Sequence, residues 1–481
     1  MSETHRVLYI ENVYFKYPRG DYVLRGVHLA VERGEHVLVV GDTGSGKTTL
    51  VRVLTGTGVT VYGGELRGTV RILGRELGDM SVEELRRLVH VVGQNPYLYF
   101  TEPLVREELL NYALVVHGSH SHAEKALEKV VETTGIHELL DRYFYELSGG
   151  EARRVQVAKA LISDPVLVVF DEPLMWLDEQ GIMEFVDILK LLRSLGKSVL
   201  VFEHRFLPLI RFMDRVFILK DGLLREVTEK AFKLLKVPLV VDYSTRDPSD
   251  QAHSSSSNVV LELRDIHFSY GKRAVLLGVN LEVREKEALF IYGLNGSGKT
   301  TLLKIIAGYL KPSKGIVRKR GDLVYVPQNI MLFYTEETVE KELVEICKAR
   351  KRGNPCVERG LKILESLGID IKQSPLSLSH GQMVKLAVTL AQVAGARLLL
   401  LDEPFSGLTY SDRLKLLEHL KKSQVSFIAT SSSLDALGTG LWSRAYKLEK
   451  GLLIEFPRDT GKNTLLYATK MYEELKHGAS Y

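Results

Sequence analysis

The chain has 481 residues, of which 45% are hydrophobic and 26% are charged, an ordinary balance for a soluble globular protein. Its 64 basic and 60 acidic residues leave a net charge of +4, which gives no overall drive toward nucleic acid. No stretch approaches the roughly 20 apolar residues that a membrane helix requires, and no signal peptide is expected at the N-terminus. Cys347 and Cys356 are too few for a disulfide framework or an iron–sulfur cluster, so the cytosol is the expected compartment.

In chain order, the first element that carries chemistry is a glycine-rich loop between an apolar strand and a predicted helix. It reads Gly41-Asp42-Thr43-Gly44-Ser45-Gly46-Lys47-Thr48-Thr49 and fits the phosphate-loop pattern in the strand-to-helix context that this pattern needs. Backbone N–H groups of such a loop surround a polyphosphate, while Lys47 adds positive charge and Thr48 offers a Mg²⁺ ligand. Tyr17 lies 30 residues before Lys47 and is predicted to stack on adenine, with a core tyrosine as the alternative.

Three further elements follow in the same segment. Gln94 comes after an apolar strand, where a neutral amide can bind Mg²⁺ and orient water. Ser148, Gly149 and Gly150 open a predicted helix and form a candidate anion site; an N-cap by Ser148 is the alternative, but capping does not explain two glycines. A buried strand at 166–170 ends in Asp171 and Glu172, which are predicted to hold Mg²⁺ and to position the attacking water, respectively.

A second set of the same landmarks follows in the same order. It comprises Tyr270, the loop Gly293-Leu294-Asn295-Gly296-Ser297-Gly298-Lys299-Thr300-Thr301, Gln328, Ser379-His380-Gly381 and the pair Asp402-Glu403. A repeat this long indicates duplicated domains rather than a solenoid. We predict a first domain at 1–240, a flexible Ser-rich linker at 241–258, a second domain at 259–455 and a tail without an assigned role at 456–481.

Together with His204, which ends a predicted strand, these motifs resemble those of the ATP-binding-cassette (ABC) ATPases over both domains. The Leu-Ser-Gly-Gly element at 147–150 is specific to that superfamily. Stretches 11–18, 203–205 and 214–222 resemble ATPases of energy-coupling-factor (ECF) importers, which take up vitamins and transition-metal ions. The resemblance implies an α/β fold with two tandem P-loop NTPase domains of the ABC type. Each would have a mainly parallel sheet core, an antiparallel β subdomain and a helical signature subdomain.

The resemblance also implies two composite sites for ATP and Mg²⁺, in which each phosphate loop faces the signature of the other domain. Site one would use Tyr17, residues 41–49 and His204, with Ser379, His380 and Gly381. Site two would use Tyr270 and residues 293–301, with Ser148, Gly149 and Gly150. The implied metal ligands are Thr48, Gln94 and Asp171 in one site and Thr300, Gln328 and Asp402 in the other. The implied catalytic residues are Glu172, His204, Gln94, Glu403 and Gln328.

The two copies differ at three of these positions. No histidine follows the strand of the second copy that corresponds to 198–202, and the register places Ser431 at the position of His204, to within two residues. Thr409 stands where the first copy has Asp178, and His380 replaces the first glycine of the signature. Because serine cannot bring positive charge to a γ-phosphate, the second site is predicted to bind ATP but to hydrolyse it slowly.

The favoured function is the ATPase subunit of an importer at the cytoplasmic face of a membrane. Its expected partners are integral-membrane coupling and substrate-binding subunits, with no nucleic acid and no direct membrane insertion. The aromatic residues after each glutamine, at 95–100 and 329–334, lie where such domains usually hold a helix of the membrane partner. The alternatives are a soluble tandem protein acting on ribosomes or nucleic acid, and a fused ATPase of a sugar importer. The transported solute does not follow from these residues.

Overall fold

The computed structural model describes residues 5–42, 44–175, 177–227, 258–434 and 442–455. They form two compact units, which we call unit 1 (described residues 5–227) and unit 2 (described residues 258–455). The predicted linker, apart from Asn258, and the predicted tail at 456–481 lie outside the described residues. Among those residues, no helix is both long and apolar enough to cross a membrane.

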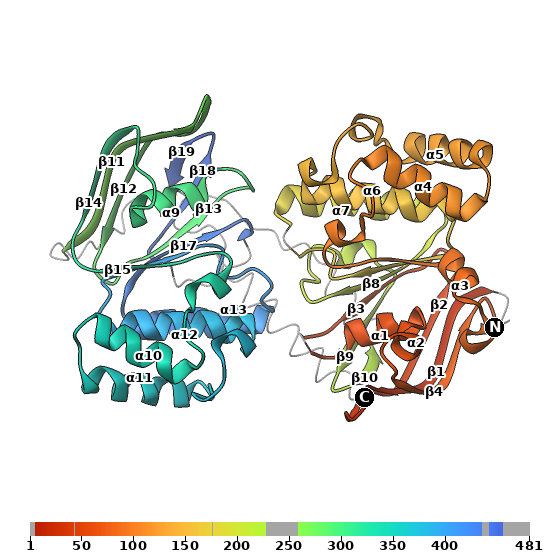
Figure 1. Cartoon of the computed structure of the whole chain (residues 1–481), viewed down its shortest axis with the longest axis horizontal. Helices are drawn as coiled ribbons and strands as arrows, with labels where there is room; N and C mark the ends of the chain where they lie inside the picture. Colours follow the sequence, from red (N-terminus) through yellow and green to blue (C-terminus); the bar gives the residue numbers. More distant parts are fainter. Residues whose placement is uncertain (1–4, 43, 176, 228–257, 435–441, 456–481) are drawn as a thin grey trace. The chain divides into compact units, whose positions relative to one another are not determined.

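Unit 1 contains two sheets of different kinds (Figure 1). The six-stranded sheet has the order β10-β9-β3-β8-β7-β6 and is parallel except for β10. The other sheet is antiparallel, with the order β2-β1-β4-β5. The strands are β1 Arg6–Lys16, β2 Tyr22–Glu32, β3 His36–Val40, β4 Glu65–Ile72, β5 Arg75–Glu76, β6 Val89–Val92, β7 Leu167–Asp171, β8 Ser198–Glu203, β9 Arg215–Lys220 and β10 Leu223–Glu226.

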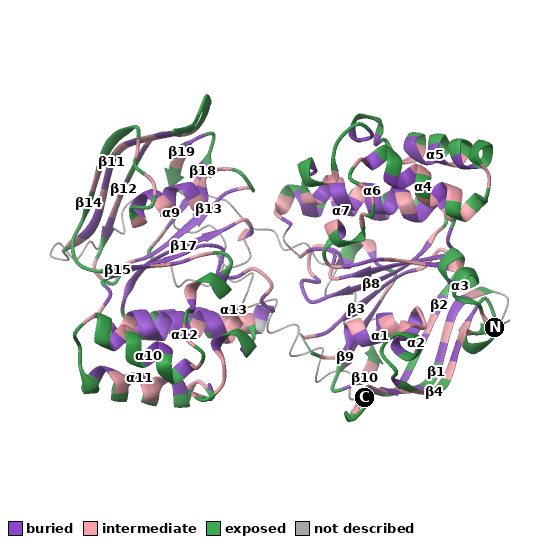
Figure 2. Cartoon of the chain, viewed as in Figure 1, coloured by how far each residue is buried: buried purple, intermediate pink, exposed green. Residues whose placement is uncertain are grey.

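The helices of unit 1 pack beside these sheets. They are α1 Lys47–Leu54, α2 Thr57–Thr60, α3 Val82–Leu88, α4 Val105–His117, α5 His120–Thr134, α6 Gly149–Ile162 and α7 Glu179–Ser194. Short 3-10 helices are η2 Leu77–Asp79, η3 Pro96–Tyr99, η4 His137–Leu139, η5 Phe144–Glu146 and η6 Ile210–Phe212. One apolar core joins the antiparallel sheet, α1 and one face of the parallel sheet. Strands β3 and β7 are buried along their whole length, as near-continuous apolar runs predict (Figure 2).

Unit 2 repeats this architecture. Its parallel-type sheet has the order β15-β16-β17-β13-β18-β19, and its antiparallel sheet has the order β12-β11-β14. The strands are β11 Val259–Tyr270, β12 Arg273–Arg284, β13 Ala288–Tyr292, β14 Lys314–Lys319, β15 Leu323–Val326, β16 Leu398–Leu401, β17 Ser426–Ser431, β18 Arg444–Glu449 and β19 Leu452–Glu455. The helices are α9 Lys299–Ala307, η7 Ile330–Phe333, α10 Val339–Ala349, α11 Asn354–Ser366, η8 Pro375–Ser377, α12 His380–Val393 and α13 Tyr410–Ser423. The predicted α/β fold with two sheet types and a helical subdomain in each copy is confirmed.

The extra residues of the first copy form defined structure. Between α1 and β6, unit 1 has α2, β4, β5, η2 and α3, whereas unit 2 has only β14 between α9 and β15. Ser81 caps α3 with a capping box, because its hydroxyl accepts from Glu84 N while Glu84 accepts from Ser81 N. The longer segment therefore enlarges the antiparallel subdomain of unit 1 and leaves the parallel sheet unchanged.

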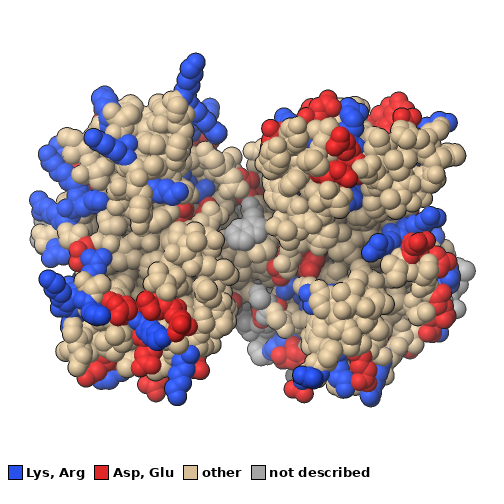
Figure 3. Space-filling view, viewed as in Figure 1, with Lys and Arg blue, Asp and Glu red and all other residues tan. Residues whose placement is uncertain are grey.

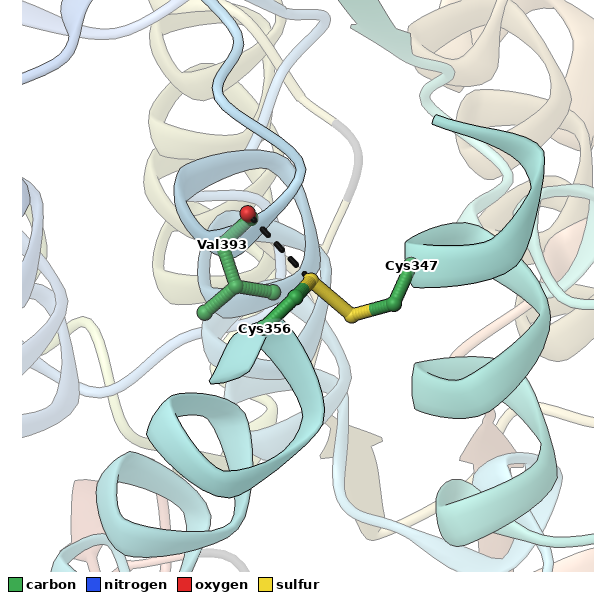
Figure 4. The surroundings of a disulfide bond; sticks show 3 residues. All are labelled: Cys347, Cys356 and Val393. Carbon is green, nitrogen blue, oxygen red and sulfur yellow. Dashed lines mark hydrogen bonds between the residues drawn. A yellow bond between two sulfur atoms is a disulfide. The ribbon is translucent and has the colours of Figure 1, made fainter. Parts of the chain in front are cut away.

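The two cysteines form a disulfide, which their number did not lead us to expect. Cys347 lies in the last turn of α10 and Cys356 in the first turn of α11, with a Cα–Cα distance of 5.8 Å. Cys356 Sγ also lies 3.4 Å from the carbonyl oxygen of Val393 at the end of α12 (Figure 4). The bond forms because the short α10–α11 turn brings these two helix ends together.

Candidate functional site

Both phosphate loops have the backbone conformation that cradles an anion. Gly44 and Gly46 have φ values of 83° and 106°, and their counterparts Gly296 and Gly298 have 77° and 105°. Non-glycine residues rarely adopt this left-handed region, so the glycines are needed for the shape of the loop. Thr43, which is part of the predicted loop, lies outside the described residues.

Each loop lysine is buried and points back into its own loop. Lys47 Nζ donates to the carbonyls of Gly41 at 2.8 Å and Asp42 at 3.0 Å, and it lies 3.1 Å from Glu172 Oε1. Lys299 Nζ repeats this arrangement with the carbonyls of Gly293 and Leu294, and with Glu403 Oε1 at 3.1 Å. The lysine and the strand-end glutamate of each copy are therefore brought together as the sequence predicted.

In unit 2 these residues line one cavity of about 470 Å³. Its lining includes Tyr270, Arg273, the glycine-rich loop, Gln328 and Glu403. Tyr270 is 52% exposed, so its ring is accessible for stacking on a base. Arg273 was missed by the sequence interpretation, because it belongs to no motif, although it lies at the start of β12 only three residues after Tyr270. Its guanidinium is near Gly296 and adds a cation beside the phosphate loop.

Tyr17, the counterpart of Tyr270 in unit 1, forms hydrogen bonds and ring contacts with the residues around it. Its hydroxyl lies 3.2 Å from Thr49 Oγ1 and accepts a hydrogen bond from Arg52 at 2.7 Å. Its ring packs edge-on against Phe15 and Tyr62. Tyr17 therefore shows much of the core character that was the alternative to base stacking, and its role with adenine stays a prediction.

Asp171 is a suitable ligand for a hard cation. Burial raises its pKa to about 6, although a hydrogen bond from Thr48 acts in the opposite direction. Its Oδ1 atom is buried and has no hydrogen-bond partner among the described residues. Asp171 therefore offers an oxygen for a cation. The other two predicted metal ligands of this site, the Thr48 hydroxyl and the Gln94 amide, also offer oxygen, and oxygen ligands are those that Mg²⁺ prefers.

Asp402 differs from Asp171, because both of its carboxylate oxygens accept hydrogen bonds. Tyr325 donates to Oδ2 at 3.1 Å and Thr430 donates to Oδ1 at 3.0 Å. A cation at this carboxylate must compete with those two hydroxyl donors. The metal sites predicted at Asp171 and Asp402 thus differ in this detail, which the sequence motifs do not reveal.

The two strand-end glutamates share a strained backbone. Glu172 and Glu403 have φ values of 48° and 49°, in the left-handed region that is costly for residues other than glycine. Such strain persists where the surrounding structure imposes it, and it recurs at functional sites. The same conformation recurs in both copies, so the two strand ends are built alike, and the catalytic role of these carboxylates stays a prediction.

Glu172 is held in its anionic form by two neighbours. Burial alone would raise its pKa, but the nearby His204 and the charge of Lys47 lower the pKa to about 2. His204 Nδ1 lies 3.7 Å from Glu172 Oε1 and 3.1 Å from Glu203 Oε1. Glu203, a buried residue that the sequence interpretation did not single out, also accepts from the backbone N–H groups of Leu174 and Arg205 at 3.0 and 2.9 Å.

Strand pairing corrects the expected counterpart of His204. Val40 pairs with Glu203 in unit 1, and the equivalent Tyr292 pairs with Ser431 in unit 2. Ser431 therefore corresponds to Glu203, and Ser432 corresponds to His204. Ser432 donates to Glu403 Oε2 through its backbone N at 3.0 Å and its hydroxyl at 3.4 Å. The expectation of Ser431 was wrong by one residue, because the sequence has no landmark that fixes register after β17.

The signature serines act as helix caps. Ser148 accepts from Glu151 N at the start of α6, and Ser379 accepts from Gln382 N at the start of α12. At Gly150 an added Cβ would lie 1.8 Å from Glu184 Oε2, so a larger residue there would displace the end of this side chain on α7. These contacts give the motif a structural reason, and anion binding by Ser148, Gly149, Gly150, Ser379 and Gly381 stays a prediction.

His380 and Thr409 differ from their counterparts with modest local consequences. His380 is the first residue of α12 and is half-buried, and burial lowers its pKa. Thr409 caps α13 through Asp412 N at 3.1 Å, just as Asp178 caps α7 through Gly181 N at 2.9 Å. The Asp-to-Thr difference therefore preserves a helix cap, although it removes a carboxylate.

A buried glutamate fixes the loop after each glutamine, and the sequence interpretation missed both. Glu108 accepts from the backbone N–H groups of Thr101 and Glu102 at 2.7 and 2.8 Å. Glu342 accepts from the backbone N–H groups of Thr335 and Glu336. The common spacing of 14 residues from Gln94 and Gln328 was the available signal.

The fold and these contacts define a class: an ATPase with two phosphate-loop domains, each with a strand-end acidic pair and a capped signature helix. The family model of the ABC transporter matches residues 24–175 and 276–406, which is more than half of the chain. The chain therefore belongs to the ABC transporter ATPase family.

Relatives of this chain have the same tandem extent. A putative ABC transporter ATP-binding protein of Sulfurisphaera tokodaii is 29% identical over 468 residues, covering 93% of this chain and 97% of that protein. A protein of the same description from Treponema denticola is 29% identical over 492 residues, covering 96% and 99%. Both matches cover nearly the full length of each partner in the comparison.

Solved structures share the fold at lower identity. The archaeal ribosome recycling factor aABCE1, solved with the ribosomal stalk protein aP1, gives a TM-score of 0.61 at 22% identity and covers 98% of each chain. CbiO1 of Clostridium perfringens, part of the complex cbiONQ, gives a TM-score of 0.41 at 25% identity and covers 46% of this chain and 87% of that one. The first likeness shows the tandem fold.

Proposed function

We propose that this chain is the ATP-hydrolysing, energy-coupling subunit of a membrane importer of the ECF type, for a vitamin or a transition-metal ion. The observation that carries this proposal is an exposed apolar surface beside each glutamine. Leu98 on η3 is 78% exposed and Leu332 on η7 is 75% exposed, and Tyr99 and Met331 beside them are also exposed. Large apolar side chains that lie together in solvent indicate a partner, and a helix of a membrane subunit fits two such short surfaces.

These surfaces are connected to the signature helices. Tyr97 on η3 donates from its hydroxyl to the carbonyl of Leu147 at 2.8 Å, immediately before the cap Ser148. Tyr334, which follows η7, donates to the carbonyl of Met383 in α12. Each loop is also held by the buried Glu108 or Glu342. A partner helix bound here would therefore act on the signature through direct hydrogen bonds.

The residues around the first phosphate loop account for hydrolysis. Glu172 is ionised at neutral pH, because of its low pKa, and is available to orient and polarise water. Thr48, Gln94 and Asp171 would hold Mg²⁺, which neutralises phosphate charge when bound. The glycine-rich loop and Lys47 would bind the phosphates, and His204 would contact the transferred phosphoryl group. The localisation that follows is the cytoplasmic face of the membrane.

The test is fractionation of the native host with affinity-tagged chain. The importer proposal predicts that the chain is found in membranes and co-purifies with integral-membrane subunits. Leu98→Asp with Leu332→Asp should abolish co-purification with the integral-membrane subunits while its basal ATPase activity is unchanged. Val115→Asp is the matched control, because Val115 on α4 is 80% exposed but lies outside both surfaces.

The same experiment also tests the alternative that the chain is a soluble tandem protein acting on ribosomes or nucleic acid. If the chain sediments with ribosomes and not with membranes, and the Leu98 and Leu332 variants behave as the wild type, the importer proposal is wrong. The soluble tandem protein acting on ribosomes would then replace it. A fused sugar-importer ATPase would instead be revealed by the identity of the membrane subunits.

A further inference from the structure

The two units carry opposite net charges although they share a fold. Residues 5–227 contain 27 Lys and Arg against 31 Asp and Glu, whereas residues 258–455 contain 29 against 21. The balanced charge of the whole chain, from which we expected no overall drive toward nucleic acid, is therefore an average over an acidic unit and a basic one. The location of the excess cations decides whether they form a binding surface.

Much of the excess lies at one end of unit 2, where β14 turns into β15 close to the α10–α11 turn. Arg350 forms an ion pair with Asp322 at 3.1 Å, and this contact joins the two turns. The Arg397 side chain lies against Gly321, and the Arg352 guanidinium lies against Gly395. We call this region the cationic end of unit 2; its cations are Lys319, Arg320, Lys348, Arg350, Lys351, Arg352 and Arg397.

Carboxylates neutralise only part of this region. Asp322 pairs with Arg350, Glu285 lies 3.4 Å from Arg397, and Glu345 lies 3.4 Å from Lys348. Arg320, Lys351 and Arg352 are exposed and have no ion pair within the described part of the chain. Lys319 Nζ contacts only the carbonyl of Ala307, at 3.5 Å. The cationic end thus presents a cluster of uncompensated charges to solvent.

Unit 1 shows that the fold does not need these cations. On its antiparallel sheet, Arg67, Arg71 and Arg75 each form an ion pair with a glutamate, at 2.6, 3.2 and 3.2 Å. The turn between α4 and α5 has histidines and serines in place of the Lys-Arg run at 350–352. Stabilisation of a helix C-terminus explains Lys348 in the last turn of α10 and Arg350 at its C-cap, but not Arg320, Lys351 or Arg352.

The cationic end is a projecting surface with a rigid base. Figure 3 shows Lys and Arg side chains projecting along the edge of unit 2 that carries β14. The disulfide between Cys347 and Cys356 closes the turn that holds Lys348, Arg350, Lys351 and Arg352. Tyr309, between α9 and β14, and Ile316, on β14, are 71% and 51% exposed. Cations that flank exposed apolar or amphipathic side chains are typical of a surface that lies on lipid headgroups.

We propose that the cationic end of unit 2 binds the anionic headgroups of a lipid bilayer, as a second attachment besides the apolar surfaces. This inference rests on the proposed function, which places the chain at a membrane. A plane of phosphate groups fits a projecting surface. Proteins that bind single-stranded nucleic acid instead use a groove with stacked aromatic side chains.

The experiment is co-sedimentation of the full chain with protein-free vesicles. Binding is expected to phosphatidylcholine vesicles with about 30 mol% phosphatidylglycerol, to be weak without the anionic lipid, and to fall as salt rises from about 0.05 to 0.3 M. Arg320→Gln with Lys351→Gln and Arg352→Gln should lower the partition coefficient about a hundredfold, at about fivefold per cation. The basal ATPase rate should not change, because β15 and β16 begin at this end and the phosphate loop follows the opposite end of the sheet.

The matched control is Arg67→Gln with Arg71→Gln and Arg75→Gln in unit 1, which should retain binding within about twofold. Equal binding to neutral vesicles, or equal loss in both triple variants, would overturn the proposal. Tighter binding to a 5′-labelled RNA oligonucleotide, lost in the unit 2 variant, would replace the lipid with nucleic acid. Since the vesicles contain no protein, failure here is distinct from failure to co-purify with a membrane subunit.

Discussion

Glu172 and Glu403 have the same backbone conformation but different partners. His204 contacts Glu172, whereas Ser432 contacts Glu403 through a hydroxyl and a backbone N–H group. A serine cannot supply positive charge to a γ-phosphate, and loss of one such preorganised contact costs about a hundred- to thousandfold in rate. Arg273 and Lys299 remain beside the second phosphate loop, so nucleotide binding there should survive.

The corrected register gives a sharp prediction for Ser432. In a Glu172→Gln background, which isolates the second site, Ser432→His should raise single-turnover ATP hydrolysis by at least about tenfold. Ser431→His is the matched control and should leave the rate unchanged or lower it, because that position corresponds to Glu203. Wild-type-like hydrolysis at the second site before any histidine is added would contradict the slow-site prediction.

Asp171 should make the ligand-free protein sensitive to pH. Its folded pKa of about 6 exceeds the unfolded value of 3.8, so the unfolded state ionises first as pH rises. The free energy of unfolding therefore falls by up to about 3 kcal/mol as the pH rises from about 4 to about 6. Asp171→Asn should raise the melting temperature at pH 7.5 and have little effect at pH 4, measured by calorimetry without nucleotide.

The control for Asp171 is Asp402→Asn, which removes a carboxylate that already accepts two hydroxyl hydrogen bonds. Asp402→Asn should not raise the melting temperature at pH 7.5, because this change weakens the hydrogen bonds from Tyr325 and Thr430. A pH-independent effect of Asp171→Asn would show that burial of the ionised carboxylate is not the cause.

At the scale of the element, the disulfide stabilises the turn between α10 and α11. Cys347 and Cys356 are nine residues apart, and a loop of that size corresponds to about 2 to 3 kcal/mol in the chain-entropy model. Cys347→Ser with Cys356→Ser should lower the stability of unit 2 by that amount, measured by urea unfolding of the full chain. A reducing agent should destabilise the wild type similarly and leave the double variant unaffected; an effect on both would exclude the disulfide as the cause.

At the scale of the whole molecule, the two copies of the catalytic residues should contribute unequally to turnover. Glu172→Gln should abolish most steady-state ATPase activity, since it removes the carboxylate that His204 and Lys47 hold as an anion. Glu403→Gln should retain most of it. Phosphate release at saturating Mg-ATP measures both, and the opposite ranking would assign the fast site to unit 2.

The motifs predicted much of this molecule because they are local. The phosphate loops, the strand-end pairs Asp171-Glu172 and Asp402-Glu403, and the starts of the signature helices depend on a few consecutive residues, although the sequence favoured an anion site over the Ser148 cap that the structure shows. The resulting backbone follows from glycine conformation and strand-to-helix order. The duplication was equally visible in the order of the landmarks, and with it the α/β fold of two tandem domains.

Tertiary structure decided what depends on residues distant in sequence. Strand pairing fixed Ser432 as the counterpart of His204, and the approach of two helix ends joined Cys347 to Cys356. Two further features depend on residues distant in sequence. Tyr325 and Thr430 donate hydrogen bonds to Asp402, and cations from separate segments cluster at one end of unit 2. Sequence determines which groups are present and their local conformation, whereas through-space packing determines which of them meet and how they are charged.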